Sequence, residues 1–318
     1  MKRAVAIVLA LMAVSTLVFA QGTVQDQIAQ SGQAAIKAAI RMLRVIGSSP
    51  CAWRRRGYTR SAMKLASWNV NSVRARLERV LAWLARQQPD VVCLQELKCT
   101  DDAFPHEAVR DAGYHAAVHG QKNYNGVAIL SRTEPTDIQA GMGDDVEDRQ
   151  ARLVAATIEG IRVLSAYVPN GSAVGSDKYA YKLGWLARVR EHLGRRLSPS
   201  QPVVFCGDLN VARFDDEVGF PDAWGGSVLC HPTAREALER VRSWGFTDVF
   251  RQHHPDGGLY SWWDYRAGAF HRNDGLRIDH VFATAPLAAL CTSAEVDRDE
   301  RKGPKPSDHA PVIAVFDL

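Results

Sequence analysis

The chain has 318 residues, 46% apolar and 23% charged, which is typical of a globular protein with enough apolar material for a core. Its formal charge of +4 is unevenly divided, because residues 1–62 carry nine Lys or Arg against Asp26 alone, or +8, and residues 63–318 therefore carry −4. A net acidic body excludes a broad basic field as the means of binding nucleic acid, so such contacts would have to come from local patches.

Residues 1–62 differ in character from the rest of the chain. The start MKR, the apolar run from Ala4 to Phe19 and the small residues that follow are typical of a secretory signal peptide. The spacing after it predicts an amphipathic helix, formed on Ile36, Ile40 and Leu43. We predict a domain boundary here, with a folded domain over 63–318. Two interpretations stay open, namely export and an N-terminal extension that reflects a misassigned start or a fusion.

The cysteines favour the second interpretation. There are six cysteines. Cys51 precedes Met63, and the other five follow it: Cys93, Cys99, Cys206, Cys230 and Cys291. Several lie inside apolar, strand-like runs, and no C-x-x-C or Cys/His spacing indicates zinc. We therefore predict buried free thiols in a reducing, cytoplasmic compartment.

From Met63 onward, strand and helix patterns alternate. A strand over 64–70 is followed by a helix over 72–88, with Ser72 as its N-cap and Pro89 after its end. Further helices are predicted over 178–193 and 233–245. Further strands are predicted over 90–95, 126–132, 151–158, 161–168, 201–210, 276–284 and 310–318, with a turn at Glu159-Gly160. This order indicates one layered α/β domain with sheets inside and helices outside.

Polar side chains follow the apolar strands at the points where the strands end. They are Asn69, Asn71, Glu96, Tyr167, Asp208, Asn210, Asp279, Asp308 and His309. Any one of the Asn or Asp residues could simply cap a loop. Glu96 is different, because a carboxylate at the end of an apolar strand costs several kcal/mol unless it is paired or binds a metal.

These residue types share a chemistry. Glu96, Asp308 and the Asn amides offer hard oxygen ligands, which suit Mg²⁺ or Mn²⁺ better than zinc. A His beside an Asp, with a second Asp directed at a water molecule, suits hydrolysis of a phosphate ester. The sequence therefore predicts a metal-dependent phosphoesterase.

Seven short motifs occur along the chain in this order: SWNVNSVRAR, LQELK, GQKNYNGVAILSR, CGDLN, SWWDYR, GLRID and KPSDHAPV. In this order they resemble the exonuclease III family of DNA repair nucleases, and within it the branch that acts as apurinic/apyrimidinic endonuclease. The resemblance covers Met63 to Leu318 and none of residues 1–62. It implies an α/β (α+β) fold, a four-layered sandwich of two packed mixed β-sheets flanked by helices.

The resemblance also implies an activity. It is hydrolysis of duplex DNA 5′ to abasic sites, with 3′→5′ exonuclease and 3′-end-cleaning activity, in base excision repair. Mg²⁺ would be the cofactor, and Mn²⁺ could substitute. The partner would be double-stranded DNA with abasic sites or blocked 3′ ends, bound by a monomer without an obligate protein partner.

Carried over by residue, the resemblance implies metal ligands at Asn69, Glu96, Asp208, Asn210 and Asp308. Asp208 would activate the water or protonate the leaving oxygen, and Asn210 would stabilise the pentacovalent phosphate. Tyr167 would contact the phosphate, activate the nucleophile or donate a proton. His309 would hydrogen-bond the scissile phosphate, oriented by Asp279.

Substrate contacts are implied as well. Trp262, Leu276 and Ile278 would line a pocket for a flipped-out sugar without its base, which a nucleotide with its base could not enter. Trp263 could belong to this pocket or to the core. Contacts to the DNA itself would come from Asn71, Arg74, Lys98 and Lys122.

Two positions depart from the family pattern: Leu97 stands where Thr is common, and His280 where an apolar residue is common. The alternative enzyme is a secreted nonspecific endonuclease or phosphodiesterase of the same superfamily, which the signal-like start favours. An inactive binding module would have lost Glu96, Asp208 or His309, and all three are present.

Overall fold

The computed structural model describes residues 62–318. The signal-like run and the helix expected at Ile36, Ile40 and Leu43 lie outside the described residues. Within 62–318, no helix has the length and apolar character needed to cross a bilayer. All five cysteines of this part are free and buried.

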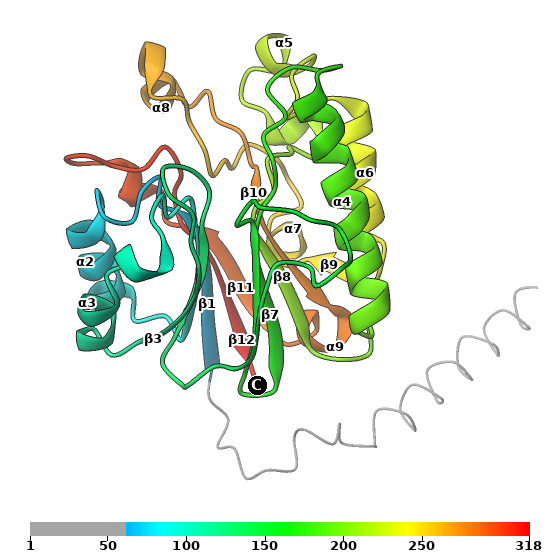
Figure 1. The fold of residues 1–318 in the computed structure, drawn as a ribbon. Helices are drawn as coiled ribbons and strands as arrows, with labels where there is room; N and C mark the ends of the chain where they lie inside the picture. The colour runs from blue at the N-terminus through cyan, green and yellow to red at the C-terminus, as the bar shows by residue number, and fades with distance from the viewer. Residues whose placement is uncertain (1–61) are drawn as a thin grey trace, which may run out of the picture. The chain divides into compact units, whose positions relative to one another are not determined.

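Two six-stranded sheets form the centre of the domain (Figure 1). The first has the order β11-β12-β1-β2-β4-β3 and the second β5-β6-β7-β8-β10-β9. Both are mixed, since β1 runs parallel to β2 and β7 parallel to β8 among otherwise antiparallel pairs. The strands of the first sheet are β1 (Ala62–Asn69), β2 (Val91–Gln95), β3 (His115–His119), β4 (Val127–Ser131), β11 (Cys291–Val296) and β12 (Val312–Asp317). Those of the second are β5 (Thr136–Ala140), β6 (Leu153–Ile158), β7 (Ile161–Tyr167), β8 (Val203–Asp208), β9 (Phe246–Asp248) and β10 (Asp279–Thr284).

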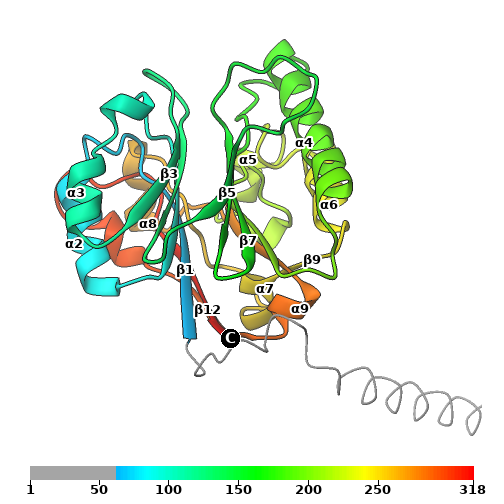
Figure 2. The same ribbon diagram turned by 60° about the horizontal axis from the view of Figure 1, so that its bottom comes forward.

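Helices cover the outer faces of the two sheets (Figures 1 and 2). On the first sheet these are α2 (Leu77–Gln87) and α3 (His106–Asp111), and on the second α4 (Asp177–Arg196) and α6 (Pro232–Arg242). The shorter helices are α5 (Pro221–Trp224), α7 (Val249–His253), α8 (Ala269–Arg272) and α9 (Ala285–Ala288). Four short 3-10 turns complete the order: η2 (Asp101–Ala103), η3 (Asp215–Glu217), η4 (Arg266–Gly268) and η5 (Arg298–Arg301).

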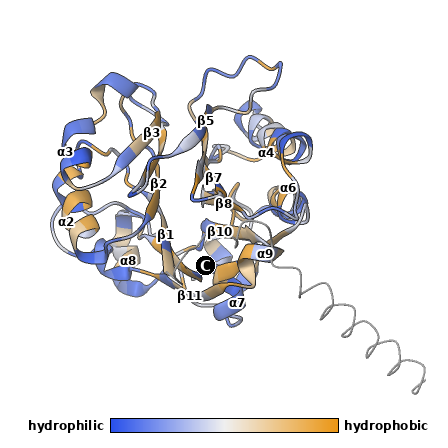
Figure 3. Cartoon of the chain, turned by 90° about the horizontal axis from the view of Figure 1, so that it is seen from below, coloured by the Kyte–Doolittle hydropathy of each residue, from blue (hydrophilic) through white to orange (hydrophobic). Residues whose placement is uncertain are grey.

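The apolar residues form three clusters that match these layers. One lies between the sheets and includes Val91, Val163 and Val204. The second joins the first sheet to α2 and α3, and the third joins the second sheet to α4 and α6. Figure 3 shows the strands coloured mostly as hydrophobic, whereas α3 and α4 carry hydrophilic stretches. The predicted four-layered sandwich is confirmed.

Strand register brings the polar strand ends together. Tyr167 pairs with Asp208 across the parallel β7–β8 pair, and Asp208 pairs with Asp279 across β8–β10. In the first sheet, Asn69 pairs with Gln95, directly before Glu96. Because carboxyl ends of parallel strands meet at one edge of a sheet, both sheets present their polar residues at the same end of the sandwich.

One predicted helix start is wrong. Helix α2 begins at Leu77 rather than after Ser72, and its N-cap is Arg76 without a side-chain cap. Ser72 has φ 85°, and its N–H donates to the Glu96 carbonyl at 2.7 Å. The chain is therefore held as a turn against the end of β2, because that pairing competes with helix formation.

The two departures from the family pattern are explained by packing. Leu97 is fully buried in the cluster beneath α2 and α3, so this position faces the core. His280 is also fully buried, and its Nε2 lies 2.8 Å from the Val211 carbonyl. The ring of His280 packs against Phe282 at 5.4 Å between centroids.

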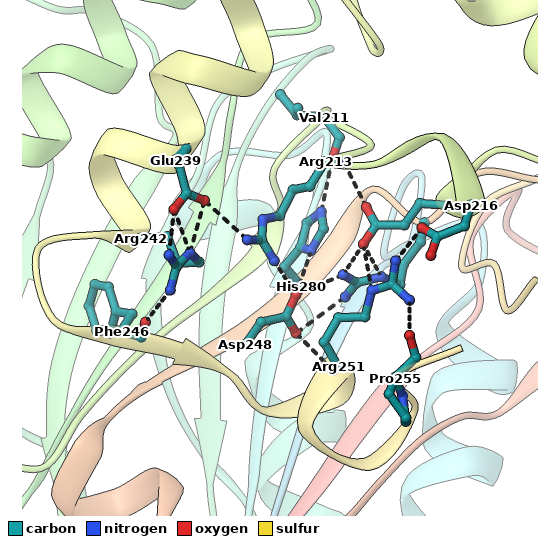
Figure 4. A network of polar contacts seen from close by, with 12 residues as sticks. Val211, Arg213, Asp216, Glu239, Arg242, Phe246, Asp248, Arg251, Pro255 and His280 are labelled. Atoms are coloured by element: carbon teal, nitrogen blue, oxygen red, sulfur yellow. Dashed lines mark hydrogen bonds and ion pairs between the residues drawn. The ribbon is translucent and has the colours of Figure 1, made fainter. Parts of the chain in front are cut away.

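A buried ionic network lies where β9 ends and β10 begins (Figure 4). Arg277 is 2% exposed, and its guanidinium binds both Glu217 and Asp248, the latter at 2.7 Å. Arg213 reaches Asp248 at 2.8 Å, and Arg251 reaches Glu217 at 3.2 Å. The network fixes the segment that carries Leu276 and Ile278, because Arg277 stands between them.

Replacing Arg277 by Met should lower the free energy of unfolding by about 3–5 kcal/mol, since Glu217 and Asp248 would be left as buried carboxylates without this cation. Urea unfolding followed by circular dichroism measures the change. As the control, Arg272→Met removes an exposed arginine of α8. If Arg277→Met lowered the free energy of unfolding by less than about 1 kcal/mol, the contribution of an exposed ion pair, Arg277 would not be the cation that stabilises the two buried carboxylates.

The same network predicts the acid sensitivity of the fold. Burial alone would raise the pKa of Asp248, but Arg277 and His280 outweigh it and hold that pKa well below its ordinary value. The pKa of Glu217 is lowered in the same way, chiefly by Arg277 against the effect of burial. Depressed carboxylate pKa values stabilise the fold above the unfolded pKa values, and this stability is lost as the pH falls through the folded ones. Below about pH 4.5, we expect the urea concentration at the midpoint of unfolding to decrease as the pH is lowered. The decrease should be smaller in Arg277→Met.

Candidate active site

The polar end of the sandwich is built on unusual backbone. Five residues there have positive φ: Asn71 (45°), Ser72 (85°), Glu96 (53°), Lys98 (54°) and Asn210 (50°). Each such conformation costs of order 1–3 kcal/mol in a non-glycine residue, and such residues concentrate at functional sites. Here the left-handed positions turn the chain immediately after β1, β2 and β8, which directs the side chains into one place.

Asn69 joins the carboxylates of the two sheets. Its side-chain amide donates to Glu96 Oε1 and to Asp208 Oδ2, each at 2.8 Å. Its Oδ1 accepts the backbone N–H of Asn71 at 3.0 Å. Asn69 and Asp208 are almost fully buried, whereas Glu96 is only partly so. In this arrangement Asn69 orients the carboxylates through its N–H groups.

A second set of contacts holds Asp308. One carboxylate oxygen accepts from Asn71 Nδ2 at 2.9 Å and the other from Trp262 Nε1 at 3.0 Å. Burial would raise the pKa of Asp308, but His309, Trp262 and Asn71 outweigh burial and lower it. Asp308 is therefore an ionised carboxylate at neutral pH.

His309 lies between two carboxylates. Its Nδ1 is 2.8 Å from Asp279 Oδ2, and its Nε2 is 3.6 Å from Asp208 Oδ2. Ser261 donates to the same Asp279 oxygen at 2.6 Å, and the Ser261 hydroxyl accepts the N–H of Ile278 and Asp279. Asp279 is thus fixed and orients the imidazole, so that Nε2 points to the site.

The protonation of this pair follows from its surroundings. Burial lowers the pKa of His309, but Asp279 and Asp208 outweigh it and raise that pKa to about 10. For Asp208, burial raises the pKa to about 7, against the lowering effect of His309. At neutral pH the imidazolium can donate a hydrogen bond, and Asp208 is poised to exchange a proton. A pKa near the working pH is what a general acid or base requires.

Tyr167 and Asn210 complete the site from β7 and β8. Burial, with Glu96 and Asp208 beside it, raises the pKa of Tyr167 well above its ordinary value, so the phenol stays protonated and can donate. Asn210 donates to the Val168 carbonyl at 3.0 Å and accepts from Asn170 Nδ2 at 3.2 Å. Both are neutral groups that can hold phosphate oxygens.

Three side chains meet closely enough to mark a metal site, and because His309 is protonated at neutral pH, Glu96 and Asp208 are the two that could ligate an ion. One ligand atom each of Glu96, Asp208 and His309 lies within 4.8 Å of the other two. Glu96 Oε2 also meets the ammonium of Lys98 at 2.9 Å, so this carboxylate already attracts a cation. The two carboxylates offer the hard oxygen ligands that a divalent ion such as Mg²⁺ prefers. The donor set therefore fits the predicted cofactor class.

The predicted pocket residues share one place but differ in exposure. Leu276 and Ile278 are fully buried in the core beneath α4 and α6, and only Trp262 is partly exposed. Trp262 exchanges backbone hydrogen bonds with Leu276, and its ring meets Trp224 edge to face at 5.4 Å. Trp263, which could have belonged to pocket or core, is 1% exposed and lies in the core.

The predicted DNA-contacting residues divide into two groups. Asn71 and Lys98 lie inside the site, where Lys98 Nζ donates to Asn71 Oδ1 at 2.5 Å. Arg74 and Lys122 are exposed on loops. Arg74 lines a groove of about 740 Å³ with other cations of this side of the domain: Arg76, Arg79, Arg86 and Lys305.

Sequence reasoning missed three residues that shape this site. Asn170 faces Asn210, Ser261 fixes Asp279, and Lys182 binds the Asn170 and Asn210 carbonyls. Asn170 stands three residues after Tyr167 in AYVPNG, and Ser261 directly precedes Trp262, so position beside a motif was a usable signal for both. Lys182 lies inside an amphipathic helix, where its side chain has the pattern of a solvated lysine.

Comparisons with known proteins agree with this geometry. The model of the endonuclease/exonuclease/phosphatase family matches residues 66–309. The exodeoxyribonuclease III of Haemophilus influenzae is 37% identical over 266 residues, covering 80% of this chain and 100% of that protein.

Solved structures show the same fold. An AP endonuclease from Archaeoglobus fulgidus superposes with a TM-score of 0.78 at 42% identity, and covers 80% of this chain and 100% of its own. A 3′ phosphatase from Neisseria, bound to a product DNA hairpin, superposes with a TM-score of 0.77 at 40% identity and with the same coverage. Each of these is a protein that the chain resembles over the whole described domain.

Proposed function

The chain belongs to the endonuclease/exonuclease/phosphatase family, and we propose that it acts there as a metal-dependent DNA repair nuclease, an exodeoxyribonuclease III. The reaction is hydrolysis of a phosphodiester bond 5′ to an abasic site in duplex DNA, with trimming of 3′ ends. The enzyme would work as a monomer on duplex DNA with abasic sites or blocked 3′ ends. The likeness to an AP endonuclease and to a 3′ phosphatase supports both activities.

The observation that carries the proposal is the meeting of Glu96, Asp208 and His309 at the end of both sheets. Asp208, whose pKa is about 7, can take a proton from an attacking water or give one to the leaving oxygen. The His309 imidazolium and the neutral donors Tyr167 and Asn210 hold the phosphate oxygens as charge develops.

We propose Mg²⁺ as the cofactor, replaceable by Mn²⁺, with Glu96, Asp208 and Asp308 as its carboxylate ligands. Asn69 and Asn210 would lie against it. When bound, the ion would neutralise phosphate charge and lower the barrier to attack by water. The preference for Mg²⁺ rests on hard oxygen donors and on the absence of thiolates from the set named here.

Selectivity for abasic sites would come from the apolar wall beside His309. Trp262 lies 6.5 Å from His309 between ring centroids, and Leu276 and Ile278 back it from the core. A sugar without its base could enter against this wall, and a complete nucleotide would be too large. A nonspecific endonuclease or phosphodiesterase is the second candidate, favoured by the signal-like start of the chain.

The test uses two proteins, Met1–Leu318 and Met63–Leu318. Each is given a labelled duplex with one abasic-site analogue and an intact duplex, in Mg²⁺ or in EDTA. We expect incision 5′ to the lesion that requires the metal, from both proteins, with the intact duplex cut only from its 3′ ends. Equal internal cutting of the intact duplex would contradict the proposal and favour the nonspecific enzyme.

A further inference from the structure

Lys182 of α4 is a buried cation to which the mechanism above gives no role. It is fully buried, and its ammonium donates to the carbonyls of Asn170 (3.1 Å), Asn210 (2.7 Å) and Val228 (2.8 Å). Burial lowers the pKa of Lys182 to about 7 although the nearby Asp208 carboxylate raises it, and the three carbonyl acceptors favour the charged form. Burying an ammonium costs several kcal/mol unless its donors are satisfied, and here three carbonyls match its three N–H groups.

The three carbonyls belong to three separate loops. Asn170 follows β7, Asn210 follows β8, and Val228 lies between α5 and α6. The side chains of Asn170 and Asn210 face one another, with 3.2 Å from Nδ2 to Oδ1. Lys182 therefore hydrogen-bonds the backbone of both Asn170 and Asn210, whose side-chain amides face the site.

The loop after β7 is shaped around this lysine. Gly171 has φ +101°, and a Cβ there would lie 3.1 Å from Tyr179 and 3.2 Å from Lys182 Cδ. A side chain at this position would be strained and would push on the lysine stem. The close approach indicates that the loop conformation and the buried ammonium depend on each other.

We propose that Lys182 is a positioning residue, which holds the loops after β7 and β8 so that the Asn170 and Asn210 amides bind the scissile phosphate together. This inference rests on the proposed function. A misplacement of about 1 Å in a group that holds the substrate can cost about 100-fold in rate. The lysine would thus act on turnover through the two amides without touching the DNA.

The first test is Lys182→Met, which keeps the length of the side chain and removes its donors. We expect kcat on the abasic duplex to fall about 100-fold, with KM changed much less, because the amides are misplaced rather than lost. Gly171→Ala, which displaces the same loop and keeps the lysine, should also lower kcat. Leu186→Ala, a fully buried leucine of the same helix, is the control for lost stability. It should lower the melting temperature and leave kcat within about twofold below that temperature.

A double-mutant cycle separates positioning from general damage. If Lys182 acts through Asn210, adding Lys182→Met to Asn210→Ala should lower kcat by far less than 100-fold. Independent, multiplicative effects would overturn the inference, as would a folded Lys182→Met with kcat near that of the wild type. If the wild type itself does not cut the abasic duplex, the proposed function fails and this inference with it. An active wild type with an unaffected Lys182→Met removes only the inference.

Discussion

Replacing Glu96 by Ala is expected to reduce incision of the abasic duplex by at least about 1,000-fold, which corresponds to roughly 4 kcal/mol of lost transition-state stabilisation. Glu96 is the partly exposed carboxylate of the central cluster and binds both Asn69 and Lys98. Without it, the site loses the ligand best placed for a cation. Single-turnover kinetics in excess Mg²⁺ measures the effect, and circular dichroism checks the fold.

The fold should tolerate this change, because the Glu96 side chain is partly exposed and does not belong to the core. Glu107→Ala, which removes an exposed carboxylate of α3, is the control and should cut at the wild-type rate. Normal incision by Glu96→Ala in Mg²⁺ would refute the metal assignment. A defect shared by both variants would indicate a general effect of lost negative charge.

Asp208→Asn is expected to lower kcat by about 100- to 10,000-fold, the range for a lost general acid or base. The change keeps the shape of the side chain and removes its capacity to exchange a proton. Because burial raises the pKa of Asp208, its ionised form is unfavourable in the fold. The melting temperature of Asp208→Asn should therefore equal or exceed that of the wild type while activity falls, a trade-off that is common at active sites.

The pH dependence of kcat distinguishes this role from a structural one. The wild type should show an ionisation that disappears in Asp208→Asn, and a bound cation would place it below the value for the free protein. Asp256→Asn, on an exposed turn, is the control and should keep the wild-type profile. An unchanged profile in Asp208→Asn would rule out Asp208 as the group that exchanges the proton.

Much of this site could be predicted from the sequence, because its residues stand where apolar strands end. Glu96 follows β2 and Asp208 ends β8, so pattern and topology together place them at the same end of the two packed sheets. Asp308 and His309 are neighbours that face different partners: Trp262 and Asn71 hold the first, and Asp279 holds the second. Their division into two tasks was implied by the family resemblance and agrees with this geometry.

Other features could not be predicted, since they depend on contacts distant in sequence. The positive φ of Ser72 arises from pairing with the end of β2, which overrides the local signal for a helix start. The amide of Asn69 uses its N–H groups toward the carboxylates, an orientation set by neighbours from both sheets. Strands β3, β5, β9 and β11 were missed. Strand β9 has only three residues, and the other three are exposed or half-buried at most positions, which leaves no clear periodic pattern.

Locating the metal ion tests the proposed catalytic centre most directly. Crystals of Met63–Leu318 grown with a DNA duplex and Mn²⁺ would show the ion by anomalous scattering. We expect one strong peak in contact with the Glu96 carboxylate, on the side of the site that Asp208 and Asp308 face, and its loss in Glu96→Ala. A peak elsewhere on the protein, or an unchanged peak in Glu96→Ala, would contradict the assignment of the catalytic centre.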